Sequence, residues 1–141
     1  MNTFYQNITQ ILLLARQRSY KAVNVAMIDA YWHVGRQIVE EEQQGKHRAE
    51  YGKKLFAYLA EKLTKDFGKG FDERNLRNMR AFYIAFPIWN AVRSKLTWTH
   101  YRLLLKVSNE KARNYYITET IENQWNTRSL ERNINSFYYE N

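Results

Sequence analysis

Apolar residues recur at intervals of three and four along nearly the whole chain, a spacing that predicts amphipathic α-helices. Four longer helices are predicted over residues 3–18, 21–43, 49–64 and 72–86. Three shorter helices are expected to begin at residue types that cap helices: Thr97, Ser108 or Asn109, and Asn126 or Thr127. A short β-hairpin near residues 87–97 remains an alternative to an irregular connector there. We therefore expect an all-α fold, a compact multi-helix domain.

Glycine and proline mark the breaks between these helices. The stretch 66–71 holds two glycines and separates the third predicted helix from the fourth, for which Asp72 is placed as N-cap. Pro87 ends the fourth helix and begins a connector over 87–96. One proline and five glycines supply too few turns for a β-sandwich or barrel. Gly35, inside the second helix, is expected to allow close packing of another helix.

The composition excludes several classes of protein. Without cysteine, the chain has no disulfide scaffold, thiolate metal site or cysteine nucleophile. Its 45% of hydrophobic residues suffices for a folded core, whereas no apolar run is long enough for a membrane span. We expect a soluble, cytoplasmic domain that needs no cofactor and engages no membrane.

The net charge of +8 lies in the middle of the chain. Residues 46–80 hold ten basic and five acidic side chains, and residues 93–114 hold six basic and one acidic. Residues 1–45 are balanced, and residues 115–141 carry a net charge of −2. Such basic blocks attract polyanions, so nucleic-acid contact is one interpretation. The other is a solvated face that keeps the domain soluble.

The helices predicted over 49–64 and 72–86, joined by a glycine-containing turn, have the outline of a helix-turn-helix. On the second of them, Arg74, Arg77 and Asn78 point away from the apolar stripe, with Arg80 at its edge. Arginine and asparagine bind guanine edges, adenine edges or phosphates. The connection of about eight residues is long for this motif. The alternative is a pair of packed helices whose outer face is merely hydrated. Contact with phosphates but not with bases is an intermediate interpretation.

Other cations extend this candidate surface. Arg102 and Lys106 lie four residues apart on the helix expected after Thr97, where they are exposed together, while Trp98 and Tyr101 are expected in the core. The full predicted set of nucleic-acid-binding residues is Arg74, Arg77, Asn78, Arg80, Lys53, Lys54, Lys69, Arg102 and Lys106.

Catalytic chemistry finds little support. His33, His47 and His100 have no partner at metal-ligand spacing and are expected on the surface or at helix caps. No acidic residue precedes a lysine by two positions, as the PD-(D/E)xK class of nuclease requires, and no acid pair is placed to hold Mg²⁺. We therefore expect no metal and no catalysis from this chain alone.

Six blocks of sequence, in order, resemble the amino-terminal domain of YhcG-like proteins. They are YGKKL at 51–55, LAEKL at 59–63, FGKGF at 67–71, RNLRNMR at 74–80, LTWTHY at 96–101 and WNTRSLER at 125–132. The resemblance runs from about Tyr31 to Tyr139. Asp72 and Asn126 depart from it conservatively, since the family usually shows serine at these caps.

The resemblance implies a helix-turn-helix or winged-helix-like domain that precedes a PD-(D/E)xK nuclease domain, in proteins linked to DNA recombination and repair. It carries over no catalytic residue. On this basis we expect residues 1–141 to form a single N-terminal domain, with a helical spine over 1–45, a helix-turn-helix-like basic part over 46–141 and no C-terminal nuclease domain.

Two functions follow from the sequence. The first is a DNA-binding or DNA-positioning domain, itself non-catalytic, of a nuclease in DNA recombination or repair. The alternative is a helical module for dimerisation or for recruiting DNA-processing proteins, without nucleic-acid contact, which the long helix 21–43 and the many aromatic residues favour. RNA binding is a weaker third interpretation. The expected partners are DNA, a second copy of the chain, and DNA-processing proteins.

Overall fold

A computed structural model describes residues 2–45, 49–88 and 96–140. Six helices and no strand occur within these ranges, so the all-α prediction is confirmed. The helices are α1 (Asn2–Gly45), α2 (Ala49–Phe67), α3 (Glu73–Ala85), α4 (Trp98–Leu104), α5 (Glu110–Asn123) and α6 (Thr127–Asn135). Most of the connector 87–96, with Trp89 and any hairpin there, lies outside the described residues.

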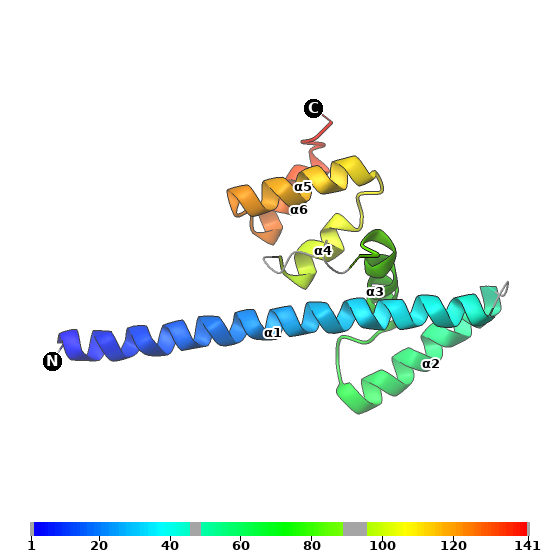
Figure 1. The fold of residues 1–141 in the computed structure, drawn as a ribbon, viewed down its shortest axis with the longest axis horizontal. Coiled ribbons are helices and arrows are strands. Elements are labelled where there is room, and N and C mark those ends of the chain that lie inside the picture. The colour runs from blue at the N-terminus through cyan, green and yellow to red at the C-terminus, as the bar shows by residue number, and fades with distance from the viewer. Residues whose placement is uncertain (1, 46–48, 89–95, 141) are drawn as a thin grey trace.

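The first two predicted helices are in fact one. α1 runs without a break through residues 19 and 20, because no glycine or proline interrupts the chain there. It forms the long axis of the molecule, with α2, α3 and α4 packed against its C-terminal half and α5 and α6 packed on α4 (Figure 1). Its N-terminal part projects as a single helix, which we call the arm (residues 2–23), and most side chains described there are exposed.

Two hydrophobic clusters hold the domain together. The smaller one joins α1, α2 and α3 through Ile38, Phe56, Leu76 and Met79. The larger one joins α1 and α3 to the three C-terminal helices; its buried members are Ile28, Trp32, Phe82, Phe86, Leu96, Tyr101, Leu104, Ala112, Tyr116, Ile117 and Leu130. Trp98, at the start of α4, packs against both clusters and so couples α4 to the α1–α3 pair.

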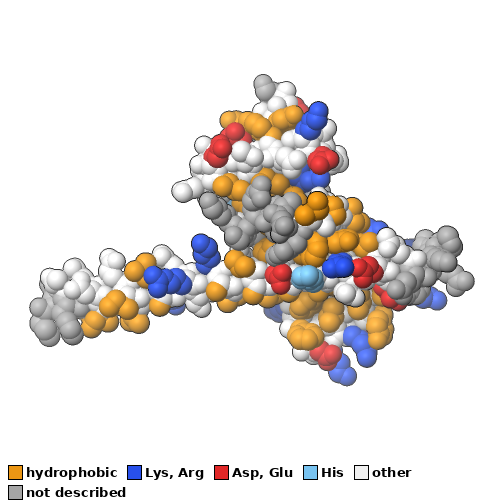
Figure 2. Space-filling view, viewed as in Figure 1, with side chains coloured by type: hydrophobic (Ala, Val, Ile, Leu, Met, Phe, Trp, Pro, Cys, Tyr) orange, Lys and Arg blue, Asp and Glu red, His pale blue; other side chains and the backbone are white. Residues whose placement is uncertain are grey.

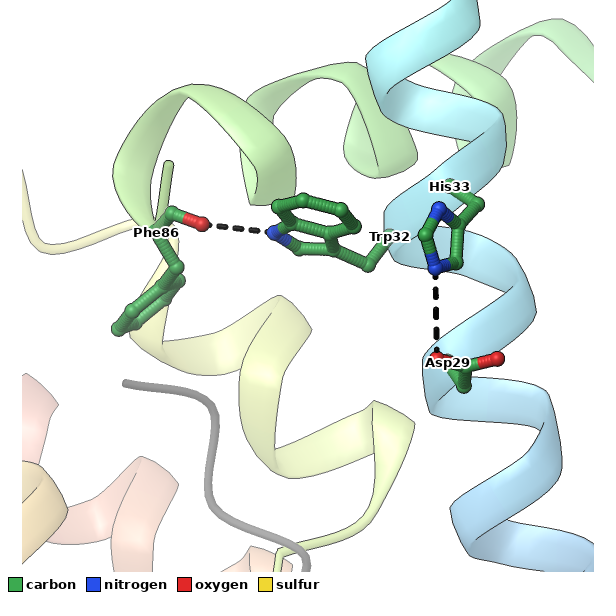
Figure 3. A network of polar contacts seen from close by, with 4 residues as sticks. All are labelled: Asp29, Trp32, His33 and Phe86. Atoms are coloured by element: carbon green, nitrogen blue, oxygen red, sulfur yellow. Dashed lines mark hydrogen bonds and ion pairs between the residues drawn. The ribbon is translucent and has the colours of Figure 1, made fainter. Parts of the chain in front are cut away.

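The crossing of α1 and α3 is close because Gly35 lies at it. A Cβ atom at this position would lie 2.1 Å from the carbonyl oxygen of Met79 and 2.8 Å from its carbonyl carbon. The expected role of Gly35 in helix packing is therefore confirmed. One turn earlier, the indole Nε1–H of Trp32 donates a 2.7 Å hydrogen bond to the carbonyl oxygen of Phe86 (Figure 3). The bond satisfies a carbonyl at the end of α3 and ties it to α1.

Side-chain caps define where the helices begin. Asp72, Thr97, Asn109 and Asn126 each accept a hydrogen bond from the backbone three residues ahead. α2 continues to Phe67, three residues beyond the prediction, so five residues rather than eight connect it to α3. Within that connection, Gly68 and Gly70 have φ angles of 85° and 103°, in the region that favours glycine. No helix in the described ranges is long and apolar enough to cross a membrane.

Candidate nucleic-acid interface

A hollow of about 580 Å³ lies between α3 and α4. Arg74 and Asn78 line it from α3, and Arg102 and Lys106 line it from α4 and the turn that follows. Four of the nine predicted binding residues, from two segments of the sequence, therefore surround one space. Its polar lining is completed by Asp72, Asn75, Thr99 and Glu131.

Burial of the opposite faces turns these side chains toward the hollow. On α3, Leu76, Met79 and Phe82 are buried, which leaves Arg74 and Asn78 one turn apart on an outer flank. On α4, Tyr101 and Leu104 are buried and Arg102 is exposed. The helical spacing of apolar residues thus determines which polar groups meet.

Asn75 joins α3 and α4, the two walls of the hollow. Its side-chain Nδ2 donates to the carbonyl oxygen of Gly70 at 2.6 Å, and its Oδ1 accepts from the indole Nε1–H of Trp98 at 2.9 Å. Its backbone N–H donates to the Asp72 cap at 2.7 Å. One residue therefore joins the glycine turn, the first turn of α3 and the start of α4. Sequence reasoning missed this role, because Asn75 and Trp98 are 23 positions apart and no spacing pattern pairs them.

Cations exceed carboxylates around the hollow. Arg74, Arg102 and Lys106 face Asp72 and Glu131, and one Asp72 oxygen already accepts the α3 cap bond. Arg102 also lies near the Tyr31 hydroxyl of α1. Burial raises the pKa of Tyr31, and the Arg102 guanidinium lowers that pKa by a smaller amount. The hollow therefore presents positive charge and N–H donors, which suits an anion.

Arg77 and Arg80 lie elsewhere. The Arg77 guanidinium sits 4.4 Å from the centre of the Phe56 ring on α2 and 3.6 Å from a Glu73 oxygen. The Arg80 Nε–H donates to Glu42 on α1. These contacts direct the Arg77 and Arg80 side chains toward α2 and α1 rather than toward α4. The carboxylates of Glu73 and Glu42 also offset the charges of the two arginines.

The remaining predicted lysines flank the hollow or lie away from it. Lys69 is exposed in the turn beside Gly70, which lines the hollow. Lys53 and Lys54 are exposed on α2 and are absent from the lining. The structure thus divides the predicted set into a group at the hollow and a group on the α1–α2 side.

The histidines with described positions have structural partners. The His100 Nδ1 accepts the Thr97 backbone N–H at 3.1 Å, so the proton lies on Nε2, which donates to the carbonyl oxygen of Trp125 at 2.9 Å. His33 lies 3.5 Å from an Asp29 oxygen one turn away on α1 (Figure 3). His47 lies outside the described residues. Nowhere in the described ranges do three histidine or acidic side chains gather as metal ligands.

The fold and the hollow define an all-α domain with a basic surface hollow, and comparison with known proteins places it further. The profile of the DUF1016 N-terminal domain family matches residues 7–141, and the chain belongs to this family. A relative in Escherichia coli (strain K12), named "Putative nuclease YhcG", is 32% identical over 168 aligned positions. This alignment covers 96% of the chain and 45% of the relative, so the chain spans about half the length of that curated protein. No solved structure matches significantly.

The resemblance to YhcG-like amino-terminal domains is thereby confirmed. The relationship is to a protein named as a nuclease, so this chain is nuclease-related.

Proposed function

We propose that this domain binds the phosphate backbone of DNA at the α3–α4 hollow and positions the DNA for a nuclease active site outside residues 1–141. The observation that carries the proposal is the convergence on one hollow of Arg74 from α3 with Arg102 and Lys106 from α4 and the turn after it. In this proposal the domain itself is non-catalytic and serves a nuclease that acts in DNA recombination or repair.

The chemistry of the hollow favours phosphate over base contacts. Its arginine and lysine side chains are donors without acceptor capacity, and the Asn78 amide adds two further donors. Phosphate oxygens receive half or more of the hydrogen bonds in protein–DNA complexes. α4 forms a second wall beside α3, so α3 cannot lie alone along the floor of a major groove. The α2–α3 pair therefore keeps the order of a helix-turn-helix, while its proposed contact is with the backbone.

Anisotropy of a labelled duplex of about 20 base pairs, titrated between 50 and 200 mM salt, tests the proposal. The logarithm of the association constant should fall linearly with the logarithm of salt concentration. Arg74→Ala and Arg102→Ala should each weaken binding and reduce the slope by about 1. Arg16→Ala removes the same charge from the arm and is the matched control. A salt-independent constant, or equal losses from all three variants, contradicts the proposal.

Competition separates the kinds of nucleic acid. Unlabelled duplex DNA should displace the probe at lower concentration than duplex RNA of the same sequence. More effective displacement by the RNA would contradict the assignment to DNA.

The non-catalytic role is tested separately. Supercoiled plasmid incubated with the purified chain and Mg²⁺ or Mn²⁺ should remain supercoiled. Nicking that rises with protein concentration and is abolished by EDTA would contradict this part of the proposal. Catalysis would then have to arise from residues 1–141.

A further inference from the structure

The arm and the residues that directly follow it, to Ala26, carry a largely apolar seam that is exposed along its whole length. Its members are Tyr5, Ile8, Leu12, Ala15, Ser19, Ala22 and Ala26, which alternate three and four residues apart. All seven side chains are exposed, Tyr5 by 71% and Leu12 by 64%. At 100° per residue they fall within an arc of about 100° on the side of α1 opposite Gly35, so α3 does not obstruct them. Apolar side chains along the projecting helix are visible in Figure 2.

The charge pattern of the arm does little to stabilise an exposed helix. Residues 1–28 contain no aspartate or glutamate, so no pair of opposite charges stabilises the helix at a spacing of three or four. Most helical stability in proteins comes from the packing of an apolar face rather than from helix propensity, and the arm packs on no other helix of the described chain. A surface of this length and continuity marks an interaction site.

Residue size along the seam identifies the partner. The large residues, Tyr5, Ile8 and Leu12, lie in its first half, and the small ones, from Ala15 to Ala26, lie in its second half. Two antiparallel copies place Tyr5 against Ala26 and Leu12 against Ser19, so each large side chain meets a small one. Parallel copies would oppose large to large at one end and small to small at the other. The seam is therefore complementary to itself in the antiparallel direction alone.

We propose that two copies of this chain dimerise through antiparallel pairing of their arms about a two-fold axis near Ala15. Such an interface is isologous and closed, because both copies use the same surface. Arg16 and Arg18 flank the seam rather than lie on it, so their stems extend along the apolar strip while their charges stay in water.

The area of contact sets the expected affinity. The seam and the flanking stems of Arg16 and Arg18 together cover roughly two-fifths of the girth of a helix about 12 Å across. Over about 33 Å, this strip buries on the order of 500 Å² per copy. The pair then buries about 1,000 Å², the lower limit for a specific interface. The dimer should accordingly form at micromolar concentrations and dissociate below them.

Sedimentation equilibrium of the intact chain between about 1 and 200 μM tests the association. The weight-average mass should rise from that of a monomer to that of a dimer. Leu12→Lys, on the seam, should weaken the dimer at least about tenfold, because the charge would be buried between the arms. Leu13→Lys, off the seam on the same helix, is the matched control and should leave the dimer unchanged. A monomer throughout the range, or equal losses from both variants, overturns the proposal.

Disulfide trapping tests the orientation, and the absence of natural cysteine makes each introduced thiol unique. Under mild oxidation, Ala15→Cys should cross-link to its own copy, since the two thiols meet at the axis. Tyr5→Cys alone should not, whereas Tyr5→Cys combined with Ala26→Cys should yield covalent dimers. Efficient cross-linking of Tyr5→Cys alone indicates parallel arms and overturns the proposal. Neither experiment involves DNA, so their outcome is independent of the proposed function.

Discussion

Gly35 allows the sharpest test of how the fold is held together. Replacing it with alanine adds one methyl group to α1, directly against the backbone of α3. The added Cβ would lie 2.1 Å from the Met79 carbonyl oxygen, where ordinary van der Waals contact begins at 3.4 Å. The two helices would have to separate by more than an ångström, because a carbonyl oxygen cannot rotate away as a flexible side chain does.

Two opposing effects determine the magnitude. Alanine is favoured over glycine within a helix by about 1 kcal/mol. Overpacking of a close contact costs about 1–3 kcal/mol, and this contact, with backbone on one side, belongs at the upper end. The net loss for Gly35→Ala is about 2 kcal/mol, or roughly 6–10 °C in the melting temperature of a domain of this size.

Gly52→Ala is the matched control. Gly52 also lies inside a helix, but a Cβ there would meet only a Glu42 side-chain oxygen at 3.8 Å. Without a clash, the helix propensity should dominate and raise stability by up to about 1 kcal/mol. Urea denaturation followed by circular dichroism measures both variants. If Gly35→Ala proves as stable as the parent, the close crossing of α1 and α3 is wrong.

Three further predictions concern the caps, the Asn75 bridge and the tyrosines. Thr97→Ala removes the cap of α4 and should lower stability by about 1 kcal/mol in urea denaturation; no change would contradict the cap. In a double-mutant cycle, Asn75→Ala and Trp98→Phe should show a coupling of about 1 kcal/mol, and additive losses would argue against their hydrogen bond. Burial raises the pKa of Tyr116 from its usual 10.0, so the folded state favours the neutral phenol. Its contribution to stability should therefore be constant up to about pH 9 and decrease above about pH 10, and Tyr116→Phe should reduce that decrease in urea titrations at several pH values.

The helices were largely predictable from local sequence. Apolar spacing identifies every helix of the described chain, and Asp72, Thr97 and Asn126 begin theirs as their residue types indicate. The division of α1 into two helices was wrong. The large apolar residues move to another face of the helix between residues 15 and 23, and a change of face resembles a break when only spacing is considered.

The candidate site was predictable in part. The outward direction of Arg74, Asn78 and Arg102 follows from the burial of neighbouring residues, which spacing gives. The meeting of α3 with α4 does not follow, since it depends on the Asn75–Trp98 bond and on the packing of Trp98 against two clusters. Sequence spacing also could not predict that Arg77 contacts Phe56 and that Arg80 contacts Glu42. Both contacts depend on the tertiary packing, because both partners lie on other helices.

The binding of DNA at the hollow between α3 and α4, as proposed, can be tested directly. Backbone amide shifts of the isotopically labelled chain, recorded by NMR during titration with a short duplex, report the contacted residues directly. The shifts should concentrate on residues 72–78 and 99–106 and should diminish as salt is added. Shifts confined to the arm or to α5, with α3 and α4 unchanged, would contradict the account.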